Sequence, residues 1–393
     1  MEFKRVFLIV ADSMGVGAAP DAHMFYNGDG TDVGSDTYGS LIASPLFSAP
    51  FLFQSGIGNI DGVSYGKCNA PVAAYGKLTE QSAGKDTVTG HWELCGVVTH
   101  KQMPTYPDGF PHKLLDDFCA RVGRGWLCNK PYSGTEVIKD YGREHIETGK
   151  LIIYTSSDSV FQIAAHESVV AVDELYRFCE IARELLCGDN AVGRVIARPF
   201  TGEYPDYIRT SNRHDYALEA PSATLCDLAC EKGCKVIGIG KIGDIFAHRG
   251  ISEEIHTKDN TDGIENTLKK LEEDFRGLCF VNLVDFDSKY GHRRNVEGYA
   301  KAVEELDRAL AKMIDMLRED DVLIVTADHG CDPGFKGTDH TREYVPVLVY
   351  GKKINAVNIG TRSSFADLGK TIADMLGICS DGLSGNSFIN LII

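Results

Sequence analysis

Short, continuous apolar runs constrain the fold of this chain more than any other feature. They occupy residues 5–11, 235–240, 278–284, 322–326 and 344–350. Runs of this length without polar alternation are typical of parallel strands that are buried on both faces. Between most of them the apolar residues recur every 3.6 positions, as over 296–318 and 365–376, which predicts helices. The pattern therefore indicates a doubly wound α/β sheet, whose ligands bind beyond the carboxyl ends of the strands.

The alternation of predicted strands and helices is interrupted between residues 100 and 220. A segment with Pro and Gly, 103–111, leads into this region, and a segment with Pro and Arg, 198–221, leads out of it. Inside it, 151–154 and 194–197 are predicted strands and 173–186 is a predicted helix. Because a single core stops growing near about 250–300 residues, a chain of 393 residues has room for two domains. We expect a catalytic core of 1–99 and 221–393 with an inserted α+β domain at 100–220.

Charge and cysteine usage narrow the class of protein. The formal net charge of -16 disfavours nucleic acid as a partner, since such binding depends on Lys and Arg neutralising phosphates. The twelve cysteines contain no C-x-x-C pair, so reduced thiols in the cytoplasm are expected. Cys226, Cys230 and Cys234 recur every four residues, which suits a thiolate cluster but better suits one helix face. The apolar run at 6–11 is too short for a signal peptide or a membrane span.

Acidic and imidazole side chains gather just after three predicted strands. Taken singly, an Asp at a strand end is usually a helix cap and a lone His is usually a buried neutral imidazole. Together they indicate a metal centre, and ligands without thiolate suit Mn, Zn or Mg. A pair of ions about 4 Å apart is the arrangement used in phosphoryl transfer. The candidate side chains are Asp12, Asp285, Asp287, His292, Asp328, His329 and His340.

A candidate nucleophile lies in residues 82–93, where small and polar residues precede a predicted helix that starts near Thr87 or Thr89. A helix N-terminus stabilises a phosphate through unpaired amides and the helix dipole. A threonine hydroxyl becomes a nucleophile when a metal lowers its pKa. The spacing does not choose between Thr87 and Thr89. Alternatively, Asp86 or Thr87 is only the N-cap of the helix.

Several longer strings resemble those of the bacterial phosphopentomutase family, in the alkaline-phosphatase superfamily. They span nearly the whole chain, and they are ADSMGVGAAPDA, GKDTVTGHWE, GTE, YTSSDSVFQIAAHE, GRVIARPF, RTSNRHDYAL, GKIGDI, NLVDFD, TADHG and GTDHTREYVP. The resemblance implies interconversion of α-D-ribose 1-phosphate, or its 2-deoxy form, and the 5-phosphate. It also implies a phosphothreonine enzyme, a 1,5-bisphosphate intermediate and activation by glucose 1,6-bisphosphate or ribose 1,5-bisphosphate. We expect a cytoplasmic monomer that serves nucleoside catabolism.

The resemblance also assigns roles to individual residues. It implies two Mn²⁺ ions, and it makes Thr87 the phosphorylated residue. One ion would be held by Asp12, Asp328 and His329, and the other by Asp287, His292 and His340. Ser156 and Asp158 match ribose contacts, and Arg194, Ile196, Arg209 and Lys241 match positions that line the substrate. The family's inserted cap domain corresponds to residues 100–220, and we expect it to open and close about its two crossings.

The residues themselves agree with part of this assignment. Arg194, Arg198, Arg209 and Arg213 fall within twenty residues of an otherwise acidic chain. Guanidinium groups bind phosphate bidentately, although Arg198 and Arg213 are as readily explained by ion pairs within the protein.

Other functions remain as alternatives. A phosphatase shares the same first half-reaction and differs only in its acceptor, water. A sulfatase is disfavoured because the segment that starts at Cys331 lacks the arginine of C-x-P-x-R. A cofactor-independent phosphoglycerate mutase has a serine nucleophile, and a sugar-phosphate binding protein would lack the nucleophile or a ligand.

Overall fold

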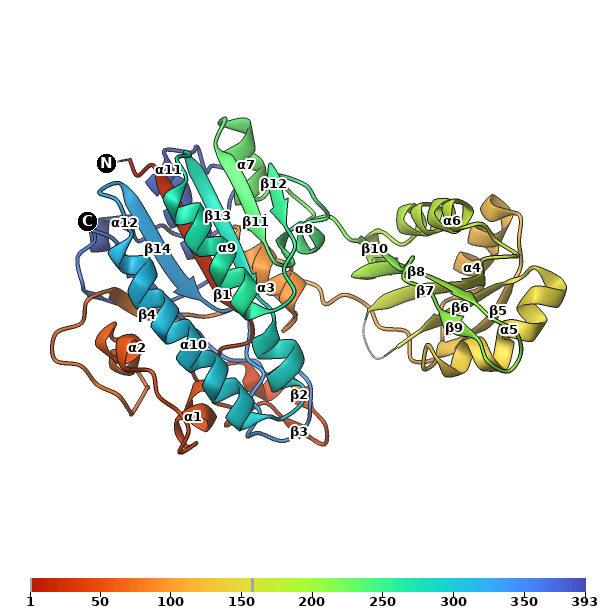
Figure 1. The fold of residues 1–393 in the computed structure, drawn as a ribbon, viewed down its shortest axis with the longest axis horizontal. Coiled ribbons are helices and arrows are strands. Elements are labelled where there is room, and N and C mark those ends of the chain that lie inside the picture. Colours follow the sequence, from red (N-terminus) through yellow and green to blue (C-terminus); the bar gives the residue numbers. More distant parts are fainter. Residues whose placement is uncertain (1, 157–158) are drawn as a thin grey trace. The chain divides into compact units, whose positions relative to one another are not determined.

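The computed structural model describes residues 2–156 and 159–393, which form two compact units (Figure 1). The core unit comprises Met1–Lys101 and Ala220–Ile393, and the inserted unit comprises Gln102–Glu219. The chain crosses between the units twice, at 101–102 and at 219–220. The sequence pattern predicts these crossings near residues 100 and 220. Asp158, a predicted ribose contact, lies outside the described residues.

Eight strands of the described part of the core unit form one sheet. In spatial order they are β12 (Glu253–Ile255), β11 (Lys235–Ile239), β13 (Gly277–Leu283), β1 (Arg5–Ala11), β14 (Asp321–Thr326), β15 (Val345–Tyr350), β4 (Ala74–Leu78) and β16 (Asn358–Arg362). The first five are parallel. Every residue of β1, β13 and β14 is buried, as expected for central parallel strands. These three strands and β11 confirm four of the predicted apolar runs.

The fifth predicted run differs from expectation in direction. Residues 344–350 are predicted as a parallel strand, but β15 pairs antiparallel with both β14 and β4. A parallel return needs a crossover connection that is usually a helix, whereas the chain between β14 and β15 contains no helix among its described residues. An apolar run that is buried on both faces does not encode the direction of its neighbours, so the prediction of a parallel strand was wrong.

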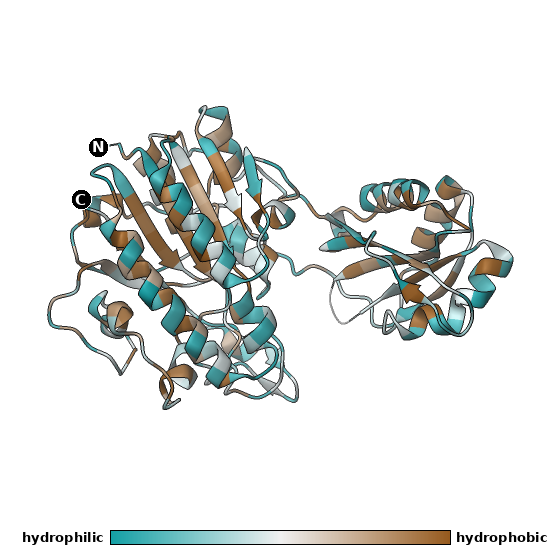
Figure 2. Ribbon diagram, viewed as in Figure 1, coloured by the Kyte–Doolittle hydropathy of each residue, from teal (hydrophilic) through white to brown (hydrophobic). Residues whose placement is uncertain are grey.

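Helices cover both faces of this sheet (Figure 1). α9 (Asn260–Glu272) packs with α10 (Val296–Asp315), and α11 (Ala366–Leu376) packs with α3 (Thr87–Leu94) and α7 (Leu225–Glu231). Figure 2 shows polar residues on the outer side of α9 and α10 and apolar residues along the strands. Coverage on two sides confirms the doubly wound α/β class. Because α7 ends at Glu231, Cys234 lies beyond the helix face predicted for it.

The remaining elements of the core unit are short. They are β2 (Tyr26–Asn27), β3 (Gly30–Thr31), α1 (Thr37–Ile42), α2 (Pro50–Gln54), α8 (Ile242–Ile245) and α12 (Ile389–Ile392). The N-terminus of α8 directly follows β11, at the same sheet edge as the ends of β1 and β13. None of the described helices is both long and apolar enough to cross a lipid bilayer.

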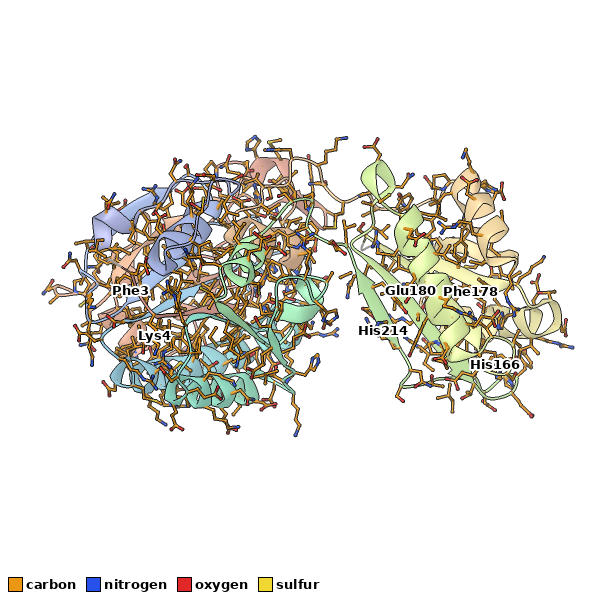
Figure 3. The ribbon with its side chains drawn as sticks, turned by 90° about the horizontal axis from the view of Figure 1, so that it is seen from above. Phe3, Lys4, His166, Phe178, Glu180 and His214 are labelled. Carbon is orange, nitrogen blue, oxygen red and sulfur yellow. The ribbon has the colours of Figure 1, made fainter. Side chains whose placement is uncertain are left out.

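The inserted unit has its own sheet and its own core. The strands run in the order β10 (His214–Ala217), β8 (Arg194–Thr201), β7 (Val160–His166), β6 (Leu151–Thr155) and β5 (Trp126–Pro131), with β9 (Ile208–Arg209) also paired to β8. One core cluster joins α4 (His112–Val122) and α6 (Val172–Leu185) to the sheet, and a second joins α5 (Glu136–Thr148). In α6, Phe178 is buried in the first cluster while Glu180 is exposed, and both are labelled in Figure 3.

Candidate active site

The carboxyl ends of three neighbouring strands bring acidic residues to one edge of the core sheet. Asp12 directly follows β1, and Asp328 comes two residues after β14. Asp287 lies in a π-helical turn, Phe286–Gly291, that begins shortly after β13. Because β13, β1 and β14 are adjacent and parallel, these three carboxylates converge although Asp12 is more than 270 residues from the other two in the sequence.

The first group of candidate ligands comprises Asp12, Asp328 and His329, whose ligand atoms all lie within 4.8 Å of one another. Nε2 of His329 is 3.5 Å from Oδ1 of Asp12 and 3.4 Å from Oδ2 of Asp328. The other ring nitrogen, Nδ1, is 3.0 Å from the carbonyl oxygen of Gly330. That contact orients the ring so that Nε2 faces the two carboxylates, as in protein metal sites whose histidine is held by an outer hydrogen bond.

The second group is centred on Asp287. Its Oδ2 is 3.2 Å from Nε2 of His292, and its Oδ1 is 3.3 Å from Nε2 of His340. The ring of His340 stacks on that of His329 with centroids 3.9 Å apart, which places the two groups side by side. All six ligand residues predicted from the resemblance therefore come together. Cys331 joins Asp287 and His292 in a further set of neighbouring ligand atoms, although the sequence pattern did not indicate it as a metal ligand.

Unpartnered buried atoms show that this centre fits cations. Oδ1 of Asp12 and Oδ1 of Asp287 are buried and accept no hydrogen bond from any described residue. Burial raises the pKa of Asp12, and the nearby carboxylates of Asp328 and Asp287 raise it further. Burial lowers the pKa of His329. Converging carboxylates are the oxygen ligands that hard divalent cations prefer, and the three imidazoles widen the choice to Mn or Zn.

Thr87 presents its hydroxyl to the candidate metal ligands from the first turn of α3. Its Oγ1 is 3.1 Å from Nε2 of His329. Asp86 is the N-cap, and its carboxylate accepts hydrogen bonds from the backbone N–H groups of Val88 and Thr89. Thr89 is buried, and its hydroxyl donates to the Asp86 carboxylate at 2.9 Å. Of the two candidate nucleophiles, Thr87 thus faces the centre while the hydroxyl of Thr89 serves the helix cap.

Two buried polar residues that the sequence analysis missed lie behind the ligands. Nδ1 of His91 is 2.8 Å from the carbonyl oxygen of Thr87 and 3.2 Å from Oδ2 of Asp328. Asn282 donates from Nδ2 to Oδ2 of Asp12 at 2.7 Å. Two features of the sequence could have indicated them. His91 follows Thr87 by four residues, which places both on one helix face, and Asn282 is the single amide within the apolar run of β13. Outer contacts of this kind commonly orient metal ligands.

Asp285, which the sequence pattern placed with the metal ligands, has a structural role instead. Its Oδ2 accepts hydrogen bonds from the backbone N–H of Asn260 at 3.0 Å and from Nζ of Lys289 at 2.9 Å. Its own N–H donates to Oδ1 of Asn260. The carboxylate is therefore satisfied by the start of α9, and it belongs to neither ligand group. The strand-end pattern alone could not separate it from Asp287.

A second candidate site is a pocket of about 220 Å³ in the inserted unit. Its lining residues are Tyr132, Gly134, Ser156, Val160, Gln162, Arg194, Ile196, Arg198, Arg209 and Arg213. Arg213 forms a two-pronged ion pair with Asp215, and Arg198 donates from Nε to Gln162 at 3.1 Å. Burial, followed by the charges of Arg213 and Arg209, lowers the pKa of Arg198. A surplus of guanidinium groups over carboxylates is suited to a phosphate anion.

The pocket contains four of the six predicted substrate-binding residues, namely Ser156, Arg194, Ile196 and Arg209. Lys241 belongs to the core unit, where it is exposed at the N-terminus of α8. α8 packs beside α3, and Trp92 of α3 donates from its indole to the carbonyl oxygen of Ile245 at 3.3 Å. Lys241 is therefore held next to the helix that carries Thr87.

Comparison with known proteins identifies the class of this fold and site. The model of the metalloenzyme superfamily matches residues 4–379, so the chain belongs to that superfamily. A phosphoglycerate mutase from Leishmania mexicana shares the fold, with a TM-score of 0.53, 13% identity and coverage of 100% of this chain and 98% of that one. The PH0037 protein from Pyrococcus horikoshii gives a TM-score of 0.50 at 14% identity, with 96% and 98% covered.

More similar relatives define the family. The chain is 53% identical to a phosphopentomutase from Lachnoclostridium phytofermentans, with 98% of both chains covered. It is 52% identical to a phosphopentomutase from Acetivibrio thermocellus, over 99% of this chain and 100% of that one. A third phosphopentomutase, from Clostridium kluyveri, is 51% identical over 99% of both. The chain therefore belongs to the phosphopentomutase family within the metalloenzyme superfamily.

Proposed function

We propose that this protein is an isomerase that interconverts α-D-ribose 1-phosphate, or 2-deoxyribose 1-phosphate, and the corresponding 5-phosphate. The observation that carries the proposal is the position of the Thr87 hydroxyl, 3.1 Å from Nε2 of His329, in a chain about half identical to named phosphopentomutases. Phosphoryl transfer needs a nucleophile held against a group that offsets negative charge, and this hydroxyl meets that need.

The metal centre would hold two Mn²⁺ ions, one at Asp12, Asp328 and His329 and the other at Asp287, His292 and His340. When bound, these ions would lower the pKa of the Thr87 hydroxyl and offset charge on the transferring phosphoryl group. The unpartnered carboxylate oxygens of Asp12 and Asp287 support this assignment. Asn282 and His91 keep the ligands oriented, since each contacts a ligand carboxylate from behind.

Thr87 would carry the phosphoryl group between the two positions of the sugar. At the first turn of α3, a phosphate on Thr87 gains from the helix dipole. Phosphothreonine 87 donates its phosphoryl group to the incoming monophosphate, which gives a 1,5-bisphosphate, and the other phosphoryl group then returns to Thr87. Glucose 1,6-bisphosphate or ribose 1,5-bisphosphate would supply the first phosphoryl group.

The arginine pocket would hold the phosphate that is not being transferred. Arg194 and Arg209 would bind it, Ile196 would line the substrate, and Ser156 with Asp158 would contact the ribose. Lys241 would add a cation beside α3. The pocket's surplus of guanidinium groups supports this role for the inserted unit as a substrate-binding cap. We also propose that the protein works as a cytoplasmic monomer in nucleoside catabolism.

The deciding experiment follows ribose 5-phosphate formation from ribose 1-phosphate with Mn²⁺ and catalytic glucose 1,6-bisphosphate, together with free phosphate. The wild type is compared with Thr87→Ala, which lacks the hydroxyl, and with Thr87→Ser, which keeps one. We expect isomerisation to exceed phosphate release greatly and Thr87→Ala to lose about 10³-fold or more in rate. Dominant release of free phosphate would instead mean that the same centre serves a phosphatase.

A further inference from the structure

A buried arginine links the nucleophile loop, residues 80–87, to the segment that carries the metal ligand His340. Arg342 lies between β14 and β15 and is 1% exposed. Its Nη1 donates to the carbonyl oxygen of Gly84 at 2.6 Å, and its Nη2 donates to that of Glu80 at 2.8 Å. The side chain therefore holds both ends of the turn that leads to Thr87.

The guanidinium group of Arg342 contacts two carboxylates and an aromatic ring. Glu80 is 2% exposed, and its Oε2 is 2.5 Å from Nη1 of Arg342. Asp21 accepts hydrogen bonds from Nε at 3.1 Å and from Nη2 at 2.9 Å, and the ring of Phe25 lies 4.6 Å from the guanidinium carbon. All three nitrogens are thus engaged, which fixes the plane of the group and with it the position of the Gly84 carbonyl.

A second contact ties the same segment to the loop. The backbone N–H of Arg342 donates to Oδ2 of Asp32 at 2.9 Å, and this oxygen also accepts from Nζ of Lys85 at 3.1 Å. Lys85 further donates to the carbonyl oxygen of Tyr26 at 2.7 Å. Gly84 and Lys85 are therefore both anchored just before Thr87, and both anchors involve Arg342.

We propose that Arg342 is a positioning residue for phosphoryl transfer, which holds the nucleophile loop so that the Thr87 hydroxyl meets His329. The proposal rests on the proposed function, because it assumes that Thr87 is the nucleophile. The loop between β4 and α3 has no regular structure of its own to fix it. A displacement of about 1 Å at a reacting atom is enough to cost on the order of 100-fold in rate.

The test must separate positioning from stability, since removing Arg342 alone leaves the Glu80 carboxylate buried and unpaired. The main variant is therefore Arg342→Met combined with Glu80→Gln, which removes the hydrogen bonds to Gly84 and Glu80 without stranding that charge. Glu80→Gln alone is the matched control, because Arg342 keeps both carbonyl contacts. Arg342→Lys keeps the charge but cannot span the two carbonyl oxygens.

The readouts are Mn²⁺ stoichiometry, the melting temperature, kcat and KM for ribose 5-phosphate, and the rate at which glucose 1,6-bisphosphate phosphorylates Thr87, followed by intact mass. We expect the double variant to lose on the order of 100-fold in kcat and in the rate of Thr87 phosphorylation, with KM changed less than about threefold. Its Mn²⁺ content should match that of Glu80→Gln. Arg342→Lys should recover part of the rate.

Either of two results would overturn the proposal. One is a double variant that phosphorylates Thr87 within about threefold of the control. The other is a loss of rate that is always accompanied by loss of Mn²⁺ or of the fold in both the double variant and Arg342→Lys, which would leave Arg342 only a structural role. If the wild type becomes phosphorylated on Thr87 but does not isomerise the sugar, the proposed function fails. The phosphorylation rates of the variants would still test whether Arg342 positions the nucleophile loop.

Discussion

The metal centre and the arginine pocket are built from opposite charges, yet both suit a phosphate. In the core unit, three aspartates and three histidines converge, and Asp12, Asp328 and His329 are almost completely buried. In the inserted unit, four arginines line an open pocket, and the side chains of Arg194 and Arg213 remain 43% and 45% exposed. The acidic site needs metal ions to bind an anion, whereas the basic pocket binds it directly.

This difference explains how a chain with a formal net charge of -16 can handle phosphate esters. The positive charge that a phosphate needs is concentrated at the two sites, while the protein as a whole stays acidic. Buried groups are weakly screened, so the metal centre should respond little to salt, while an exposed arginine pocket should weaken as ionic strength rises. Changes confined to one unit should therefore affect metal content or substrate affinity separately.

The largest expected effect comes from changing Asp287, whose carboxylate lies next to the imidazoles of both His292 and His340. Asp287→Asn removes the charge that faces both His292 and His340, so we expect loss of one Mn²⁺ per chain and a fall in kcat of about 10³-fold or more. Metal analysis after dialysis and the isomerase assay check both. Asp285→Asn is the matched control because the Asp285 carboxylate accepts a hydrogen bond from the backbone N–H of Asn260 at the start of α9 and belongs to neither ligand group. Equal loss of metal in the two variants would contradict the assignment of ligands.

A smaller effect is expected in the arginine pocket. Arg209→Met removes one charged hydrogen-bond donor worth about 1.5–3 kcal/mol, so KM for ribose 5-phosphate should rise roughly 10- to 100-fold with Mn²⁺ content unchanged. Arg121→Met is the control, since Arg121 also lies in the inserted unit but pairs with Glu184 at the surface. If instead kcat falls and KM stays constant, the pocket does not bind the ground-state substrate.

The smallest effect concerns a buried carboxylate that belongs to neither site. Glu343 accepts hydrogen bonds from the backbone and hydroxyl of Thr37 and from the hydroxyl of Thr341. Burial, followed by the charge of Asp332, raises its pKa to about 8, against 4.5 for an ordinary glutamate. Between these pH values the folded state keeps a proton that the unfolded state has lost. Stability should therefore fall as pH rises, by at most about 1.4 kcal/mol per pH unit.

Denaturant unfolding of the metal-free protein at pH 6 and pH 8 measures this slope. Glu343→Gln cannot ionise, so its free energy of unfolding should change less between the two pH values than that of the wild type. The other titrating groups are common to both proteins and cancel in the comparison. An equal pH dependence in the two proteins would show that Glu343 is ionised throughout this range.

Local pattern was enough to predict much of the fold. The run at 5–11 became β1 with the predicted bounds, and the 3.6-residue period over 296–318 became α10, which ends three residues earlier at Asp315. Burial on both faces makes such runs continuous and easy to read. Pattern could not predict the antiparallel direction of β15, nor the short strand β4, whose buried and half-buried residues alternate.

For the candidate site, the sequence indicated the possible metal ligands but not the residues that contact them from behind. The candidate ligand residues stood out because polar residues that can bind metals follow apolar strands, but the same pattern included Asp285. The choice of Thr87 over Thr89 came from a family resemblance and stays a prediction. In the structure the hydroxyl of Thr89 donates to the carboxylate of Asp86. His91 and Arg342 were missed because their roles depend on partners that no local pattern reveals.

The sequence by itself determined which residues can carry the chemistry, because residue type and spacing fix local elements and the side chains at their ends. Only the tertiary structure decided which of them meet. Arg342 and Gly84 are 258 residues apart, and Asn282 and Asp12 are 270 apart, yet each pair shares a hydrogen bond. Adjacent strands bring the ends of distant segments to one edge of the sheet, whether they are parallel, as β13 and β1 are, or antiparallel, as β15 and β4 are. That adjacency is set by packing rather than by local sequence.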